Sequence, residues 1–288
     1  MRAVLLLLLL CFVVVSSALT RVVVTGGAGR TGKVVFKKLL ERTEYEPLAV
    51  VRTEDSRRKL VKETGCKESN VAVADTTDMG SLTTVMTGQD KLILCTSAVP
   101  KLSKLSIVKT LLLKLIGKKG GPKFSFRENG TPYDVDYLGA KNQFDAAKAA
   151  GLKQVVVIGS MGGTQPDNFL NTIGKIDGDD LSGNILLWKR KAEQYLIKSG
   201  LCYTIIHPGG LLDKPGGERE IVFGVDDQLL KEKVRSIPRA DVAEVCVQAL
   251  GIARAGKRSF DVISKEGGAV TTDWNGFFNN AGDCKYEG

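Results

Sequence analysis

The segment from Val22 to Phe36 constrains the fold of this chain more than any other part. It reads VVVTGGAGRTGKVVF, in which β-branched residues give way to three glycines spaced three apart and then to a helix-forming sequence. This pattern predicts a strand that turns sharply into a helix whose first amides lack partners, a geometry that suits a pyrophosphate. An ordinary strand-to-helix loop is the alternative, but the segment begins a long β/α alternation, which favours a dinucleotide. The residues expected at the phosphates are Gly26, Gly29, Arg30, Thr31 and Gly32.

Strand-like and helix-like segments alternate along most of the chain. After the first strand, and with helical segments between them, strands are expected at 47–52, 71–75, 91–100, 153–160 and 202–207. The alternation predicts an α/β fold of Rossmann type, a doubly wound, mainly parallel sheet with strand order beginning 3-2-1-4-5-6. We expect one NAD(P)-binding domain over 20–288, in which about 208–288 form a small C-terminal substrate-side portion. The elements expected there are strands near 220–223 and 259–263 and a helix at 239–252.

The residue after the second strand indicates which dinucleotide binds. An acidic side chain there would bind the 2′-hydroxyl of the adenosine ribose, whereas an arginine accepts a 2′-phosphate. The chain has Arg52 at this point, followed by Arg57 and Arg58, and Arg30 in the glycine loop could add a second phosphate contact. Arg57 and Arg58 fit equally well on the solvated face of the next helix. The sequence therefore favours NADP(H) over NAD(H).

Further candidate ligands follow the other strands, because ligands bind at the carboxyl ends of the strands in such sheets. Asp75 is expected beside adenine, although an aspartate at this place is equally often the cap of the next helix. Small residues leave room for a ribose or a nicotinamide, and the glycines after the sixth strand let the backbone lie close to a flat ring. The residues concerned are Thr96, Ser97, Ala98, Ser160, Pro208 and Gly209.

The chain is basic, with a net charge of +9, and much of the excess is local. Seven lysines and no acid lie between 101 and 123, inside an expected insertion at 101–132. A lid over the site, a peripheral insertion and a membrane-surface helix at 101–119 remain open, and membrane contact is the less favoured of these. No zinc-finger spacing or aromatic-basic repeat points to nucleic acid. The oligomeric state is not indicated.

Residues 1–19 have the pattern of a targeting leader. One early arginine precedes an apolar run from Ala3 to Val15 and small residues up to Ala18, which predicts a secretory signal peptide. Five cysteines remain after the leader without a CxxC pair, which is typical of a reducing compartment. A complex plastid reached through the endoplasmic reticulum reconciles these signals, and the secretory or endoplasmic reticulum lumen is the alternative.

The chain resembles the atypical short-chain dehydrogenase/reductases, and most closely the NmrA-like NAD(P)-binding proteins of plants and algae. The resemblance rests on the three glycines, Ser160, Lys191 followed by Ala-Glu, the segment YTIIHPGG and the segment PRADVA, which occur in this order and cover nearly everything after residue 20. It implies a Rossmann fold, a bound dinucleotide, and Ser160 and Lys191 as candidate catalytic residues. Lys191 would bind the nicotinamide ribose and Ser160 a carbonyl.

One departure from the family pattern leaves the reaction open. Catalytic members have a tyrosine four residues before the lysine, but this chain has Leu187 there, with Trp188 beside it. A phenol near an ammonium can give a proton at neutral pH, and leucine cannot. A reductase of unknown substrate would need another donor, for which the candidates are Tyr133, Tyr137 and His207. The alternative is a dinucleotide-binding redox sensor or assembly factor without turnover.

Overall fold

The computed structural model describes residues 19–102, 106 and 124–286. The predicted leader, apart from its last residue, lies outside the described residues. So does nearly all of the lysine-rich helix predicted at 101–119. The predicted domain boundaries therefore stay predictions.

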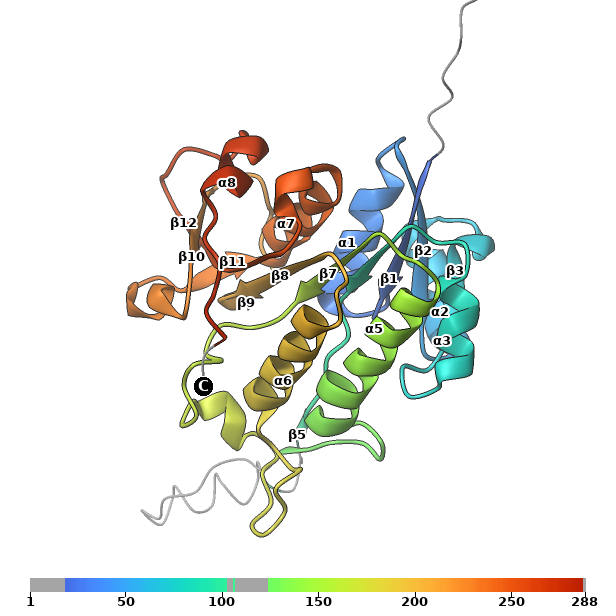
Figure 1. The fold of residues 1–288 in the computed structure, drawn as a ribbon, viewed down its shortest axis with the longest axis horizontal. Coiled ribbons are helices and arrows are strands. Elements are labelled where there is room, and N and C mark those ends of the chain that lie inside the picture. Colours follow the sequence, from blue (N-terminus) through green and yellow to red (C-terminus); the bar gives the residue numbers. More distant parts are fainter. Residues whose placement is uncertain (1–18, 103–105, 107–123, 287–288) are drawn as a thin grey trace, which may run out of the picture.

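One eight-stranded sheet runs through the molecule (Figure 1). Its strands are β1 (Thr20–Thr25), β2 (Tyr45–Val51), β3 (Val71–Val73), β4 (Lys91–Leu94), β7 (Gln154–Ile158), β8 (Tyr203–Pro208), β10 (Glu220–Gly224) and β12 (Arg258–Lys265). The order across the sheet is β10-β12-β8-β7-β4-β1-β2-β3, and all neighbours are parallel except β10 and β12. The first six parallel strands thus follow 3-2-1-4-5-6, and the predicted Rossmann-type fold is confirmed.

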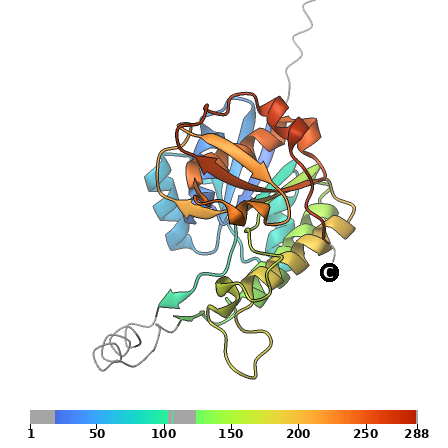
Figure 2. The same ribbon diagram turned by 90° about the vertical axis from the view of Figure 1, so that its left-hand side faces the viewer.

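Helices cover both faces of the sheet (Figures 1 and 2). They are α1 (Arg30–Leu40), α2 (Glu54–Thr64), α3 (Met79–Met86), α5 (Ala140–Ala149), α6 (Ile185–Lys198), α7 (Arg239–Gly251) and α8 (Trp274–Asn280). The core on one face contains α1, α7 and α8, and the core on the other contains α3, α5 and α6. Because both faces are covered, central strands are mostly apolar, and all five residues of β7 are buried.

The helical segment before β7 does not begin as an α-helix. Its first part is a π-helix, η2 (Tyr133–Gly139), which continues directly into α5. A π-turn inserts an extra residue per turn and is frequent at functional sites, because it redirects side chains that an α-helix would place elsewhere. Here it brings the side chain of Asp136 into the interior, next to the end of β4.

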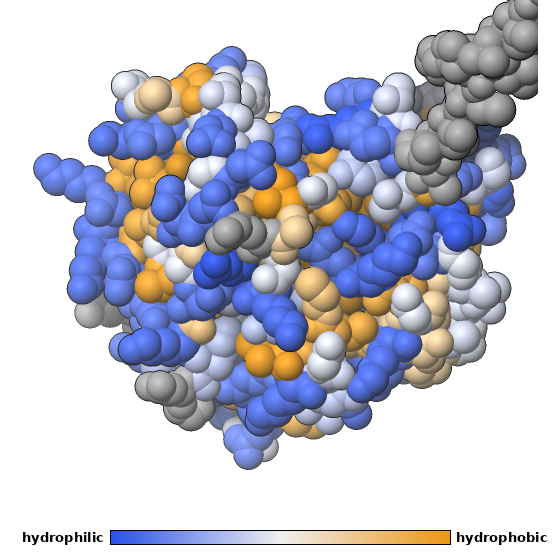
Figure 3. All heavy atoms as spheres, turned by 45° about the horizontal axis from the view of Figure 1, so that its top comes forward, coloured by the Kyte–Doolittle hydropathy of each residue, from blue (hydrophilic) through white to orange (hydrophobic). Residues whose placement is uncertain are grey.

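Short elements complete the described part. They are the 3₁₀-helices η1 (Glu68–Asn70), η3 (Phe169–Thr172), η4 (Gln228–Lys231) and η5 (Ala253–Ala255), and the strand pairs β5 (Lys101–Leu102) with β6 (Phe124–Ser125) and β9 (Gly210–Leu212) with β11 (Ser236–Pro238). The face in Figure 3 carries mainly hydrophilic residues with apolar ones scattered among them. Within the described ranges, no helix has both the length and the apolar character that crossing a bilayer requires.

Candidate functional site

The glycine loop leaves the first turn of α1 open at the carboxyl edge of the sheet. Gly26 has a φ of 68°, and a Cβ there would lie 2.8 Å from the carbonyl oxygen of Cys95. A side chain at position 32 would overlap the Gly26 carbonyl, so the loop can pack this tightly only with glycine. Gly29 is the N-cap residue of α1 and no side chain caps the helix. The amides of Arg30, Thr31 and Gly32 are therefore left for an anion.

Arg52 stands apart from the arginines that follow it. Arg57 pairs with Glu54 and Glu68, and Arg58 pairs with Asp55, so both belong to the charged surface of α2 and its surroundings. Among the described residues, Arg52 makes no hydrogen bond or ion pair, and it is exposed directly after β2. Its guanidinium is the one in this group that is available to a ligand.

Arg30 has a partner within the chain. Its guanidinium forms an ion pair with Asp213, which lies after β9, and Asp213 also accepts a hydrogen bond of 2.6 Å from Arg239. The two arginines depress the pKa of Asp213, chiefly through the hydrogen bond from Arg30. An anion at the glycine loop would have to share Arg30 with this carboxylate.

Asp75 lies after β3 and does not cap the next helix. The cap of α3 is Asp78, whose carboxylate accepts a hydrogen bond from the Gly80 amide. Asp75 instead accepts hydrogen bonds from the amide and the hydroxyl of Thr77, at 2.9 and 2.8 Å. Partial burial acts to raise its pKa, but these bonds and the charges of Arg127 and Arg52 lower it overall. An ionised carboxylate therefore stands after β3 at this edge of the sheet.

The small residues after β4 border a buried ion pair. The Ala98 amide donates to Oδ2 of Asp136 at 3.0 Å, and Lys189 Nζ lies 2.7 Å from Oδ1 of the same carboxylate. The Asp136 side chain is 0% exposed and the Lys189 side chain 14%, so this is a desolvated contact. Thr96 accepts a hydrogen bond from the Gln143 amide. Ser97 is exposed beside them.

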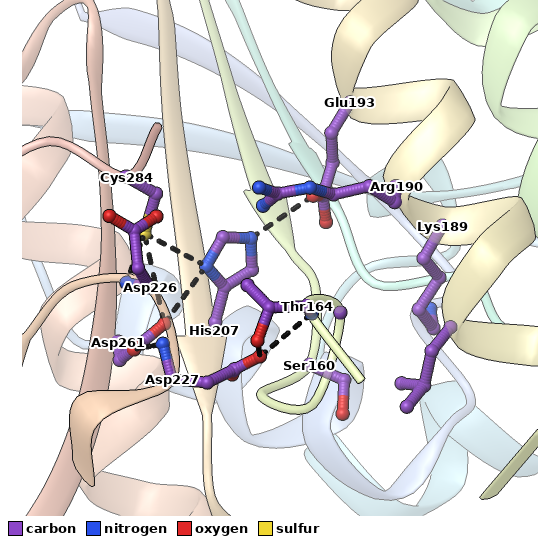
Figure 4. Close-up of a pocket in the computed structure, with 12 residues that line it drawn as sticks. Ser160, Thr164, Lys189, Arg190, Glu193, His207, Asp226, Asp227, Asp261 and Cys284 are labelled. Carbon is purple, nitrogen blue, oxygen red and sulfur yellow. Dashed lines mark hydrogen bonds and ion pairs between the residues drawn. The ribbon is translucent and has the colours of Figure 1, made fainter. Parts of the chain in front are cut away.

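Ser160 lies just beyond β7, in a cleft that it shares with Lys189 (Figure 4). Among the described residues, its hydroxyl bonds to the Met161 carbonyl oxygen alone, at 3.0 Å, and so can be redirected to a ligand. A second cleft beside it is lined largely by apolar residues and by the backbone of Pro208 and Gly209. A Cβ at 209 would overlap the Arg235 carbonyl, so glycine allows the two backbones to touch.

The resemblance implied that Lys191 and Ser160 lie together at the site, but the structure places them apart. Lys191 is exposed, and its ammonium lies 4.6 Å from the centroid of the Trp188 ring. Two residues along an α-helix correspond to about 200°, so Lys189 and Lys191 point to nearly opposite sides of α6. The face that packs inward carries Lys189 and Glu193. Lys189 is the lysine of this helix that lines the cleft.

The alternative proton donors lie in two different places. Tyr133 and Tyr137 pack with Trp188, at centroid distances of 4.8 and 5.7 Å, and neither lines the clefts around Ser160. Leu187 is exposed on the outer side of α6. His207 does line the first cleft, which contains Ser160 and Lys189, but its ring is almost completely buried.

His207 is held between two carboxylates at the carboxyl end of β8 (Figure 4). Nε2 lies 3.1 Å from Oε2 of Glu193, and Nδ1 lies 3.2 Å from Oδ1 of Asp261 and 3.7 Å from Sγ of Cys284. Burial acts to lower the pKa of His207, but the charges and hydrogen bonds of these neighbours raise it well above its usual range. The partners come from 14, 54 and 77 residues away, so the sequence carried no local signal for this cluster.

Comparison with known proteins gives consistent matches. Residues 26–252 match a family model described as NAD(P)H-binding. An uncharacterized chloroplastic protein of Arabidopsis thaliana is 47% identical over 261 residues, covering 89% of this chain and 74% of that protein. Sanguinarine reductase of Eschscholzia californica is 42% identical over 270 residues, covering 90% of this chain and 94% of the enzyme. A Bacillus halodurans structure described as an NAD-dependent epimerase/dehydratase has a TM-score of 0.65 at 21% identity, covering 90% of this chain and 99% of that one.

Proposed function

Since the chain belongs to the NAD(P)H-binding family, we propose that it is an NADP(H)-dependent reductase acting on a flat, largely apolar carbonyl, quinone or enone. The observation that carries this proposal is an uncapped helix start at the same edge as Arg52, an arginine without a partner in the part of the chain that the structure describes. Two of the phosphate-binding elements of a dinucleotide site are thereby available without any rearrangement of the loop. Sanguinarine reductase, similar over nearly its whole length, is itself a reductase by name.

The preference for NADP(H) rests on Arg52. The amides of Arg30, Thr31 and Gly32 would hold the pyrophosphate, which both dinucleotides contain. Arg52 lies close enough to Asp75 for its charge to lower the pKa of that carboxyl, so the two residues mark one end of the proposed site. A planar guanidinium forms two parallel hydrogen bonds to a phosphate, which a ribose hydroxyl cannot match.

The reacting end of the site lies at Ser160 and Lys189. When bound, the nicotinamide supplies the hydride. The Ser160 hydroxyl donates a hydrogen bond to the substrate oxygen, and the Lys189 ammonium holds a ribose hydroxyl and stabilises the negative charge that develops on this oxygen, which then takes a proton from water. Asp136 fixes the position of Lys189, since its carboxylate is held in turn by the Ala98 amide. Lys189 thus takes the part that the family pattern gives to Lys191.

The second cleft provides the substrate class. Its wall contains Met161, Leu170, Leu211, Leu230 and the Pro208-Gly209 segment, and Arg235 and Arg239 are its charged groups. Mainly apolar walls and a glycine without a side chain favour a flat ring system over a sugar.

The proposed compartment is a plastid. The similar Arabidopsis protein is chloroplastic, and the five cysteines of the described residues are all free, which fits a reducing environment. Entry through the secretory route is a prediction from the leader. A fluorescent fusion of the full chain tests both: plastid fluorescence that depends on residues 1–19 supports the proposal, and accumulation in the medium contradicts it.

The function is tested with NADPH and a panel of quinones, aldehydes and enones. Calorimetry should detect NADPH binding, and at least one aromatic member of the panel should be reduced with loss of absorbance of NADPH. Tight binding without turnover across the panel would instead favour a redox sensor or assembly factor. Absence of binding to either NADPH or NADH would reject both functions.

A further inference from the structure

We propose that His207, Asp261 and Cys284 form a site for a divalent transition-metal ion, with Zn²⁺ as the ion that fits best. The three side chains come from β8, β12 and the segment after α8, and all three are buried. Imidazole, carboxylate and thiolate are the three donor types that bind Zn²⁺ in proteins. The site shares no residue with the glycine loop or with the Lys189–Asp136 pair, so it does not depend on the proposed reductase activity.

The distances between the donor atoms match one face of a coordination tetrahedron. Bond lengths of about 2.0–2.1 Å to N and O and about 2.3 Å to S imply separations of about 3.3 Å between N and O and about 3.5 Å between S and either of them. The separations here are 3.2 Å for His207 Nδ1 to Asp261 Oδ1, 3.7 Å for Cys284 Sγ to His207 Nδ1 and 3.8 Å for Cys284 Sγ to Asp261 Oδ1. An ion needs only small side-chain shifts to bond to all three atoms.

The surroundings of His207 are those of a metal-bound histidine. Its other ring nitrogen, Nε2, lies 3.1 Å from Oε2 of Glu193, the carboxylate-histidine arrangement that fixes the tautomer of metal ligands. The Tyr286 hydroxyl donates to the same oxygen, at 3.3 Å, so Glu193 is itself oriented. Oδ2 of Asp261 accepts a hydrogen bond from the Asp227 amide, which leaves Oδ1 directed at the cluster (Figure 4).

Charge also favours a cation at this position. A divalent ion would replace the Nδ1 proton of His207 and the thiol proton of Cys284, and would balance the charges of the thiolate and the Asp261 carboxylate, while the Nε2–H of His207 keeps its contact with Glu193. Three protein ligands leave a fourth position for a water or another ligand, and the cluster lies at the bottom of the cleft beside Ser160.

An ion here would also fasten the end of the described chain to the sheet. Cys284 is already anchored through its amide to the Ser259 carbonyl, at 2.7 Å, and the Lys285 amide donates to Asp226. A bond from Sγ to the ion would add a direct link between this segment and β8 and β12. Metal binding should therefore raise the stability of the whole fold.

The test uses the full chain, stripped with a chelator, reloaded with Zn²⁺ and passed through gel filtration under reducing conditions. Elemental analysis should find one zinc per chain, and Co²⁺ in place of Zn²⁺ should give a thiolate-to-cobalt charge-transfer band. Glu193→Gln should weaken zinc affinity by about 10- to 100-fold, and Cys284→Ser should weaken it at least as much and abolish the band. Cys66→Ser removes a thiol of another part of the fold and should change neither result.

Two outcomes overturn the proposal. One is wild-type protein that retains no stoichiometric zinc and gives no cobalt-thiolate band, which means that His207 is simply an ion-paired histidine. The other is Cys284→Ser that binds zinc as tightly as the wild type, which places the ion elsewhere. Because the cobalt band is measured on the wild type, the test stands even if a variant does not fold.

Discussion

The start of α1 and the ends of β7, β8 and β12 lie along one edge of the sheet, but they are built from different chemistry. At α1 the functional groups are backbone amides, and the glycines around them leave no space for a Cβ. Beside the ends of the other strands, the functional groups are buried ionisable side chains from strands and helices. They are Lys189 with Asp136, and His207 with Glu193 and Asp261. A backbone site is sensitive to added volume, whereas a side-chain site is sensitive to loss of one partner. The following predictions test this difference.

The largest effect is expected at the side-chain region, from removing Lys189. Lys189→Ala should lower kcat/KM with NADPH by about 100- to 1,000-fold, because it removes the cation proposed to stabilise the developing oxyanion. Lys191→Ala is the matched control on the outer side of α6 and should stay within about threefold of the wild type. Steady-state NADPH oxidation with an active member of the panel measures both.

Folding has to be separated from chemistry in this pair. Removing Lys189 leaves the buried Asp136 carboxylate without its cation, which costs about 3–5 kcal/mol of stability. The double variant Lys189→Met with Asp136→Asn removes both charges and should regain stability in thermal unfolding while it stays inactive. An active double variant, or equal losses in the two lysine variants, would count against the role of Lys189.

The backbone region should respond to volume. Gly32→Ala places a methyl group against the Gly26 carbonyl and should weaken NADPH binding by about 10- to 100-fold, since relieving the overlap costs about 1–3 kcal/mol. Gly251→Ala is the matched control, because a Cβ there would meet nothing closer than the Tyr45 hydroxyl at 3.6 Å. Calorimetric titration with NADPH measures both variants. Unchanged binding by Gly32→Ala would contradict a phosphate site at this loop.

Arg52 tests which dinucleotide the backbone region receives. Arg52→Ala should reduce NADPH affinity by about tenfold, the loss of one charge-assisted contact, and leave NADH affinity unchanged. Arg58→Ala, in which only a surface ion pair with Asp55 is lost, should change neither. If Arg52→Ala lowers both affinities equally, the arginine binds something other than the 2′-phosphate.

The smallest effect concerns a side-chain contact behind the backbone region. Glu244 of α7 binds Lys38 at 2.8 Å and Arg42 at 2.5 Å, and so holds α7 against α1. Burial acts to raise its pKa, but the hydrogen bonds from Lys38 and Gln248 and both charges lower it below its ordinary value of 4.5. Its contribution to stability is therefore complete above about pH 4.5 and is lost as the pH falls through the lowered value.

Glu244→Gln should accordingly cost about 1 kcal/mol at pH 7, measured by urea unfolding, and less at pH 3. Glu41→Gln, next to the C-terminal end of α1 and exposed, serves as the control. An equal loss at pH 7 and pH 3 would show that the pair acts by packing instead of charge.

The same difference decides what could be predicted from the sequence. The glycine loop is contiguous and its chemistry is backbone geometry, so both its position and the strand order that surrounds it followed from local pattern. Ser160 at the end of β7 and Arg52 at the end of β2 followed from the parallel sheet. Lys189 did not, because a family motif was aligned by spacing, and only the packed face of α6 distinguishes it from Lys191.

The positions of Asp136 and of the His207 cluster could not be predicted from local sequence patterns, for further reasons. Asp136 turns inward because η2 is a π-helix, which an α-helical periodicity does not anticipate. Glu193, Asp261 and Cys284 meet His207 only after three separate segments are folded together. Long separations of this kind leave no periodic signal in a single sequence.

Asp213, shared between Arg30 and Arg239, acts as a counter-ion beside the glycine loop. The Arg30 and Asp213 side chains are 68% and 61% exposed, so their ion pair is weak and is easily exchanged for another anion. An incoming phosphate can take over Arg30 while Arg239 retains the carboxylate. Without a ligand, Asp213 offsets the charge of Arg30, so a phosphate would have to compete with this carboxylate for the guanidinium.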